Sequence, residues 1–448
     1  MKYNELKFKR TREIYESVIE YVTGGVHSSG RSPIYFASGK GSRIWDVDGN
    51  EYIDLCCNMG ACILGHGHSQ VVSSVREHLE NGLTTGMELE VTTEVAKKIT
   101  QMIPSAEIVK FSTSGTEAVF LAIQVARGYT GKQKLVKLEG GMNGRIDYVA
   151  VSTNPRSKDI GPANQPNPVP NHPGLLSDAV KNTIIIPFND VDSSTKIIKK
   201  HKHELAAVIM EPVMFGLGCI LPRKDFLKAI REVTEDLGIV LIFDEIITGF
   251  RLAPGGAQQY YGVTPDLTTL GKAIGNGFPL SAVVGKKEIM QVTEPRRRGT
   301  KEVYVPFSGT YNANQVGIAA AKATLEILKD GKVQKYLHES IARFAKNFDA
   351  IAEELKIKAH IQHIAGKFQV YLTDQEVVDF RTALKYAATE EKIRKFEIFS
   401  QRLLNSGLYW LPGWSGHKGI TVAHTEKDME IVLQKMEAAL EKREKYGN

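Results

Sequence analysis

Hydrophobic positions in the middle of the chain follow two alternating periods. From about residue 90, stretches with helical periodicity alternate with short apolar runs rich in β-branched residues. The helical stretches include Glu90–Met102 and Glu117–Gly128, and the apolar runs are Ile108–Phe111, Leu135–Leu138, Thr183–Pro187, Ala206–Met210 and Ile239–Phe243. Continuous apolar strands separated by helices predict a mostly parallel sheet with helices on both faces.

The two ends of the chain have different patterns. An amphipathic helix is predicted over about residues 7–22, and residues 42–55 alternate around Asp48-Gly49, which predicts a β-hairpin. After about residue 325 the chain becomes helical and charged, with predicted helices near Gln334–Leu355, near Thr382–Leu404 and after Thr425, where Asp428 completes a capping box. We therefore predict an α/β fold with a large domain over residues 61–325 and a smaller α+β domain made of residues 1–60 and 326–448.

Composition narrows the class of protein. The 448 residues carry a formal charge of +6, and basic runs such as Arg296–Arg298 have no aromatic interleaving, so we interpret them as solvated faces and expect no nucleic-acid partner. The cysteines, Cys56, Cys57, Cys62 and Cys219, lack CxxC spacing, which favours buried thiols over a zinc site or disulfides. The polar N-terminus is unlike a signal peptide and no apolar run has membrane-spanning length, so we expect a cytoplasmic protein without a membrane partner.

The first chemical motif is a turn between a predicted strand and a predicted helix. Ser114, Gly115 and Thr116 offer hydroxyls and free backbone N–H groups at a helix N-terminus, which is a suitable site for an anion. By itself such a Ser/Thr-rich turn is more often only a helix cap.

Two further motifs contain a carboxylate and an amine. The apolar strand that ends in Asp244 places Asp244 and Ile246 on the same face, at the strand end where ligands sit in open α/β sheets. Lys272 follows in an apolar, glycine-rich segment, where desolvation lowers a lysine pKa and favours attack on carbonyl carbons. Taken alone, the first could be an exposed acidic strand end and the second an ordinary surface charge.

Together the three motifs match one cofactor. A phosphorylated pyridine aldehyde, pyridoxal 5'-phosphate (PLP), needs an anion cup for its phosphate, a carboxylate for its ring nitrogen and a lysine for a Schiff base. We therefore expect a PLP enzyme in which Lys272 and Asp244 are the catalytic residues.

These motifs also carry a family resemblance. The chain resembles the class III aminotransferases of PLP fold type I, in the branch of glutamate-1-semialdehyde aminomutase and β-phenylalanine aminotransferase. The resemblance covers nearly the whole chain and rests on ordered motifs: Gly24-Gly25-Val26 with Arg31, Leu64–His68, Ser114–Ala118, Glu211-Pro212-Val213, Asp244–Arg251, Pro265-Asp266, Gly271-Lys272 and Gly309-Thr310.

The resemblance implies roles for individual residues. Lys272 would hold the cofactor, Asp244 would pair with the ring nitrogen, and Ile246 would pack on one ring face; Glu211 also belongs to the cofactor site. Ser114, Gly115 and Thr116 would bind the phosphate together with Thr310 of a neighbouring subunit, which implies a homodimer with shared active sites. Arg31 would bind the substrate carboxylate. The Pro- and Asn-rich residues 152–178 fall where the family has a mobile loop, and His66 and His68 belong to a structural motif, so no metal is expected.

Two departures from the family bear on function. Met142-Asn143 replaces an aromatic-His pair, and we predict that Met142 covers the ring through its thioether; the alternative is that another residue covers it. Gly416 occupies the position of a glutamate of the aminomutase, which favours an aminotransferase with a reshaped pocket. Trp414, His417 and Lys418 would line that pocket or be ordinary loop residues.

The expected reaction is the transfer of an amino group from an α- or β-amino acid to a keto acid. The alternative within PLP chemistry is an isomerase, either an aminomutase or an amino-acid racemase. A racemase needs a second proton-transfer group opposite Lys272, which the sequence does not obviously supply. An alternative of another class, a PLP-binding protein without turnover, is disfavoured by the intact Lys272, Asp244 and anion cup.

Overall fold

A computed structural model describes residues 7–28, 31–82, 86–155, 158–223, 225–411, 413–416 and 418–441. The chain divides into two compact units. The first contains the described residues up to Ser69, Lys335–Glu376 and those from Lys385 onward; the second contains Gln70–Gln334 and Val377–Leu384. One long central segment thus builds most of the second unit, and both chain ends belong to the first.

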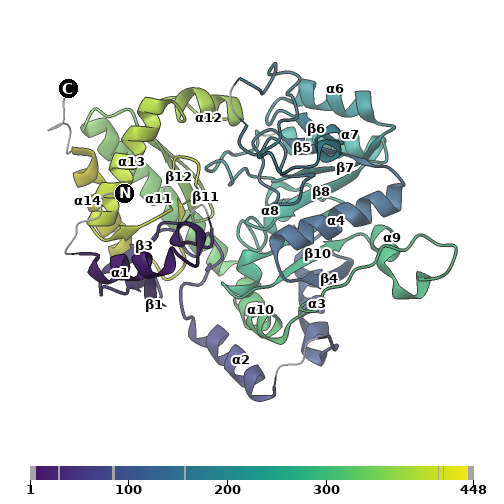
Figure 1. The fold of residues 1–448 in the computed structure, drawn as a ribbon, viewed down its shortest axis with the longest axis horizontal. Coiled ribbons are helices and arrows are strands. Elements are labelled where there is room, and N and C mark those ends of the chain that lie inside the picture. The colour runs from purple at the N-terminus through teal and green to yellow at the C-terminus, as the bar shows by residue number, and fades with distance from the viewer. Residues whose placement is uncertain are drawn as a thin grey trace. The chain divides into compact units, whose positions relative to one another are not determined.

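The second unit is built on a mixed sheet with the strand order β4-β10-β9-β8-β7-β5-β6 among the described residues (Figure 1). The strands are β4 Ile108–Ser112, β5 Lys134–Leu138, β6 Thr183–Ile186, β7 Leu205–Met210, β8 Val240–Glu245, β9 Leu267–Leu270 and β10 Ser281–Gly285. From β8 to β6 neighbouring strands are parallel, as the apolar runs predict, and β9 is parallel to β8. The sequence pattern revealed neither β9 nor β10, and β10 is antiparallel to both β4 and β9.

Helices cover this sheet. Alanines and branched residues of α4 are buried with residues of β5, β7, β8, β9 and β10 in one hydrophobic cluster. The helices of the second unit are α2 Ser69–Glu80, α3 Glu90–Met102, α4 Gly115–Thr130, α5 Ser177–Lys181, α6 Val191–His201, α7 Phe226–Asp236, α8 Gly256–Tyr261, α9 Lys287–Met290, α10 Gln315–Leu328 and α12 Phe380–Tyr386. Short 3-10 turns occur at Lys272–Gly275, Gln291–Thr293 and Pro295–Arg297.

The first unit combines two small sheets with long helices. One sheet has the order β1-β2-β3-β13 and the other β11-β12-β14. The predicted hairpin is the antiparallel pair β2 and β3. The elements are α1 Lys9–Val18, a 3-10 turn at Thr23–Gly25, β1 Phe36–Lys40, β2 Arg43–Asp46, β3 Glu51–Asp54, α11 Lys332–Glu354, β11 His360–Ile364, β12 Lys367–Tyr371, α13 Glu390–Asn405, β13 Leu408–Tyr409, β14 Lys418–Gly419 and α14 Glu426–Glu441.

One predicted helix was wrong and one helix start was right. The helix predicted near Thr382–Leu404 is two helices, α12 and α13. The second begins anew at Thr389, whose side chain caps α13 by accepting a hydrogen bond from the Lys392 N–H at 3.4 Å. At the start of α14, Thr425 and Asp428 exchange backbone-to-side-chain hydrogen bonds of 3.0 and 3.1 Å, as a capping box requires.

The topology places several strand ends of the second unit at one edge of its sheet. β5, β7, β8 and β9 run parallel, and β4 runs in the same direction because β10 is antiparallel to both β4 and β9. Their carboxyl ends therefore meet at one edge, which is where open α/β sheets bind ligands. Most of the residues predicted to bind the cofactor lie at or just after these ends.

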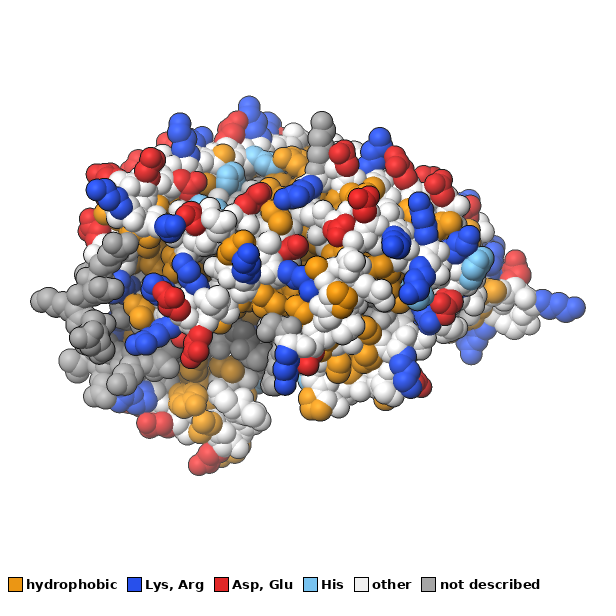
Figure 2. All heavy atoms as spheres, turned by 90° about the horizontal axis from the view of Figure 1, so that it is seen from above, with side chains coloured by type: hydrophobic (Ala, Val, Ile, Leu, Met, Phe, Trp, Pro, Cys, Tyr) orange, Lys and Arg blue, Asp and Glu red, His pale blue; other side chains and the backbone are white. Residues whose placement is uncertain are grey.

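No helix in the described part of the chain is long and apolar enough to cross a membrane. On the face drawn in Figure 2, basic and acidic side chains are interspersed.

Candidate active site

The predicted anion cup lies between β4 and α4. Ser114 has extended backbone angles and caps α4, since its hydroxyl accepts a hydrogen bond from the Glu117 N–H at 3.3 Å. Gly115 opens the helix, and a Cβ at this position would lie 3.1 Å from Cδ1 of Ile246. The glycine therefore lets the helix N-terminus approach Ile246 closely, and the N–H groups of that terminus favour an anion.

Asp244 is buried at the end of β8, with three hydrogen bonds to its carboxylate. Asn143 Nδ2 donates at 2.9 Å, Thr269 Oγ1 at 3.1 Å and the Ile246 N–H at 3.2 Å. Thr269 is the register partner of Asp244 on β9, so the sheet itself brings these two side chains together. Burial raises the pKa of Asp244, while the hydrogen bonds and the charge of Lys272 act in the opposite direction.

Glu211 holds the loop that carries the predicted ring-covering residue. Its carboxylate accepts hydrogen bonds from the backbone N–H groups of Met142 at 2.9 Å and of Phe215 and Gly216 at 3.2 Å each. Burial raises the pKa of Glu211 to about 7, and the nearby charge of Asp244 acts in the same direction. Glu211 thus lies among the cofactor residues and positions their backbone.

The same loop also lies against the anion cup. A Cβ on Gly144 would be 3.1 Å from both Cα and Oγ1 of Thr116, and Gly144 has a φ of +98°. Residues 142–144 are therefore held between the end of β7 and the start of α4. Met142 is 36% exposed, so its side chain is accessible to a ligand.

Lys272 begins a 3-10 turn directly after β9, in a left-handed conformation with a φ of +45°. Such angles are uncommon for residues other than glycine and often occur at functional sites. A Cβ on the preceding Gly271 would lie 3.0 Å from Cδ1 of Ile246, so Ile246 packs between the cup glycine and the lysine segment. The positive charge of Lys272 acts to lower the pKa of both Asp244 and Glu211, so its ammonium lies near both carboxylates.

Most predicted cofactor residues therefore meet in the second unit. Arg31 belongs to the first unit, where it is exposed and lines a groove of about 460 Å³ together with Asn58, Met59 and His66. Thr310 is exposed on the second unit. A Cβ on the neighbouring Gly309 would lie 3.0 Å from Oε1 of Glu117, in the first turn of α4. The roles of Arg31 and Thr310 remain predictions.

The first histidine of the Gly-His motif, His66, is bound within the first unit. His66 Nε2 lies 2.7 Å from Oδ2 of Asp54, and this hydrogen bond, together with one between His66 and Cys62, raises the His66 pKa to about 10. Within the described ranges no group of three His, Cys, Asp or Glu residues is arranged to hold a metal ion.

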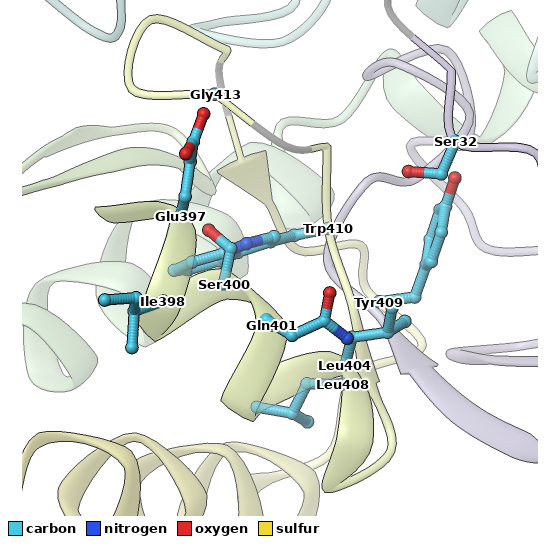
Figure 3. Close-up of a pocket in the computed structure, with 10 residues that line it drawn as sticks. All are labelled: Ser32, Glu397, Ile398, Ser400, Gln401, Leu404, Leu408, Tyr409, Trp410 and Gly413. Carbon is cyan, nitrogen blue, oxygen red and sulfur yellow. The ribbon is translucent and has the colours of Figure 1, made fainter. Parts of the chain in front are cut away.

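The first unit contains a second hollow, a cavity of about 390 Å³ between α13 and the segment around β13 (Figure 3). Its lining includes Ser400, Leu404 and Trp410, and it shares Ser32 and Tyr409 with the Arg31 groove. The cysteines of the described chain are buried and form no disulfide with one another. His417 lies outside the described residues; Lys418 is buried and donates to the Gly413 carbonyl at 2.9 Å, so it packs inside this unit.

Sequence reasoning missed two groups at the site. Thr269 was not predicted, although its place beside Asp244 follows once the strand register is known. Lys137 is fully buried inside β5, and the signal for it was a charged residue among the apolar residues Leu135, Val136 and Leu138.

Comparison with known proteins decides the family. The family model for class III aminotransferases matches residues 26–420. Glutamate-1-semialdehyde 2,1-aminomutase of Methanocaldococcus jannaschii is 39% identical over 440 residues, which cover 97% of this chain and 99% of that protein. The chain belongs to the class III aminotransferase family. The family resemblance is therefore confirmed.

Solved structures agree with this assignment. An omega-transaminase from Sphaerobacter thermophilus matches with a TM-score of 0.90 and 30% identity, over 96% of this chain and 97% of that one. A transaminase with PLP bound matches with a TM-score of 0.86 and 28% identity, with the same coverage. The fold is the predicted PLP fold type I, and the protein is a PLP-dependent enzyme of this class.

The residues present fit PLP. The helix N-terminus at Gly115 suits the phosphate, and the hydrogen-bonded carboxylate of Asp244 suits a protonated ring nitrogen. Asn143 Oδ1 is buried and, within the described residues, has no hydrogen-bond partner, so it can accept one from a ligand. Ile246 offers an apolar side chain between the cup and the lysine.

Proposed function

We propose that this enzyme moves an amino group, with Lys272 as the residue that binds PLP covalently. The observation that supports this best is the common location of four features in the second unit: the cup at Gly115, the buried Asp244, the apolar Ile246 and the left-handed Lys272. Each occurs alone in many proteins, but their combination suits one cofactor.

Each residue has a distinct task in this proposal. When bound, PLP supplies an aldehyde that takes up an amine and a ring that accepts electrons. Asp244 holds the proton on the ring nitrogen, supported by Asn143 and Thr269. Lys272 would hold the cofactor through Nζ, and its free amine would act as the base that moves the proton at the substrate carbon. Arg31 binds the substrate carboxylate, which makes an amino acid the substrate class.

Two outcomes of this chemistry each have a supporting observation. Transfer within one molecule, as in an aminomutase, is supported by the 39% identity to glutamate-1-semialdehyde 2,1-aminomutase over almost the whole chain. It is our first candidate, although the sequence pattern favoured the other. Transfer between an amino acid and a keto acid is supported by Gly416 at the position of the aminomutase glutamate, and by the similarity to an omega-transaminase.

The deciding experiment measures products. Purified protein loaded with PLP is mixed with glutamate-1-semialdehyde in one sample and with a panel of α- and β-amino acids plus a keto acid in the other. An aminomutase converts the semialdehyde to its amino isomer without a second substrate. An aminotransferase does not form that isomer, and it releases more than one equivalent of a new keto acid per active site only when both the amino acid and the acceptor keto acid are present. No product in either sample, with PLP bound, would contradict both candidates.

We also propose that the enzyme works as a homodimer that shares its active sites through Thr310. Several large apolar side chains of the second unit are exposed in the single chain, and a dimer would cover those that lie at its interface. The exposed side chains are Leu79, Met87, Phe120, Tyr129, Val303 and Tyr311. Sedimentation of the PLP-loaded wild type and of a Thr310→Ala variant should show a dimer for both. A PLP titration should show weaker binding by the variant than by the wild type.

A further inference from the structure

Lys137 is a fully buried lysine that lies outside the roles described so far. It belongs to β5, and its ammonium donates to three backbone carbonyls: Val151 at 2.7 Å, Gly141 at 2.9 Å and Leu138 at 3.2 Å. A lysine ammonium has three donor hydrogens, so these acceptors use its whole capacity. A buried charge is costly unless it is fully hydrogen-bonded, which makes this arrangement a strong constraint on the backbone.

The three carbonyls come from both ends of residues 138–151, the first part of the long segment after β5, which is called the loop from here on. Leu138 and Gly141 begin the loop, and the Gly141 N–H also donates to the Leu138 carbonyl at 3.1 Å, which closes a tight turn. Val151 ends the loop, 14 residues after Lys137. Lys137 therefore ties the start of the loop to its end, and residues 142–144 lie between these attachment points.

The tied loop carries groups that reach the cofactor residues. The Met142 N–H binds Glu211 at 2.9 Å, and Asn143 Nδ2 binds Asp244 at 2.9 Å. Glu211 and Glu139 are the carboxylates whose charges act on Lys137, so the lysine also balances negative charge beneath the loop. If the loop shifted, Asp244 would lose the Asn143 donor.

We propose that Lys137 is a positioning residue of the PLP site: its ammonium holds residues 138–151 so that Asn143 stays hydrogen-bonded to Asp244. This inference rests on the proposed role of Asp244 and extends it to a side chain that has no direct contact with Asp244. Burial lowers the pKa of Lys137 to about 7, against the opposing charges of Glu211 and Glu139. The neutral amine has two donor hydrogens for three carbonyls, so its deprotonation should loosen the loop.

The test compares Lys137→Met with Val136→Ala. Methionine keeps the length of the side chain and removes its donors, while Val136 is a buried neighbour in the same strand whose truncation destabilises the sheet without touching the three carbonyls. Hydrogen exchange of the cofactor-free protein should be faster in residues 139–151 of Lys137→Met than in Val136→Ala. The PLP dissociation constant of Lys137→Met should rise roughly ten- to a hundredfold, as expected for the loss of a charged hydrogen-bonding group, and that of Val136→Ala should change less than twofold.

A double variant identifies the route of the effect. If Lys137 acts through Asn143, adding Asn143→Ala to Lys137→Met should weaken PLP binding little beyond the weaker-binding single variant. Unchanged loop exchange in Lys137→Met, wild-type PLP affinity, or fully multiplied losses in the double variant would overturn the proposal. If Lys137→Met does not fold, Lys137→Gln serves in its place, because it retains amide donors without the charge. Failure of the wild type to bind PLP would contradict the proposed function instead, and loop exchange without cofactor would still test Lys137.

Discussion

Arg381 offers a quantitative test of how the long segment after β5 is held. Its guanidinium makes two hydrogen bonds of 2.9 Å to the carboxylate of Glu139, which is 3% exposed. It also donates to three backbone carbonyls at 2.9–3.2 Å. These belong to Ile160, Gly161 and Pro162, in the Pro- and Asn-rich segment predicted to be a mobile loop. Arg381 therefore attaches that segment to the end of β5.

The expected cost of removing this guanidinium follows from burial. Arg381→Met leaves the buried carboxylate of Glu139 and the three carbonyls without their donor, and breaking a buried ion pair costs about 3–5 kcal/mol. Because the Arg381 side chain is 22% exposed, we expect the lower end, about 3 kcal/mol. If that energy holds the segment down, its open population rises roughly a hundredfold.

Limited trypsin digestion measures this opening at the exposed Lys158. Cleavage after Lys158 should be roughly a hundred times faster in Arg381→Met than in the wild type under conditions where opening is rapid. Lys181→Met is the matched control, because it breaks the exposed ion pair with Asp178, which contributes little. Cleavage of Arg381→Met at the wild-type rate would refute the reasoning.

Three further variants test the site and the first unit. Asp244→Asn keeps the shape of the side chain but removes its charge. PLP absorbance titrations should therefore show roughly ten- to a hundredfold weaker binding, and product assays almost no turnover, at unchanged thermal stability. Normal turnover would exclude the proposed role of Asp244. Gly216→Ala would put a Cβ 2.6 Å from Cβ of Met142, so the loop must move and PLP affinity should fall; unchanged affinity would show that the loop adapts freely. The His66 pKa is raised from 6.5 to about 10, chiefly by Asp54, so its stabilisation is complete below pH 6.5 and is lost as pH rises toward 10. Between pH 6.5 and 10 the wild type should therefore lose more stability than His66→Gln, by roughly 1–3 kcal/mol after screening. Thermal melting at each pH measures this loss, and the same pH dependence for both proteins would contradict it.

Local sequence patterns were sufficient for much of the fold. The apolar runs that end near Leu138, Met210 and Phe243 became the parallel strands β5, β7 and β8, because such strands are buried on both faces. β10 was missed because its five residues follow a glycine-rich segment, and its antiparallel insertion between β4 and β9 depends on distant partners. The break between α12 and α13 was missed because Thr389 caps a helix inside a charged, helix-favouring stretch.

The same distinction applies to the site. The sequence motifs identified Asp244 and the cup because each lies at the end of one predicted strand, and Lys272 because it is a lone lysine in an apolar, glycine-rich segment. The hydrogen bond between Asn143 and Asp244 joins residues 101 positions apart and could not be predicted from either motif. The task of Lys137 depends on the path of a whole loop, so the buried charge was visible in the sequence but its partners were not.

The central claim is that PLP is bound covalently by Lys272. Its most direct test is reduction of the PLP-loaded protein with borohydride, followed by proteolysis and mass spectrometry of every lysine-containing peptide. We predict a reduced cofactor adduct on Lys272 in the wild type and no specific adduct in Lys272→Ala. An adduct on another lysine, such as Lys137, or no adduct on the wild-type protein, would contradict the account.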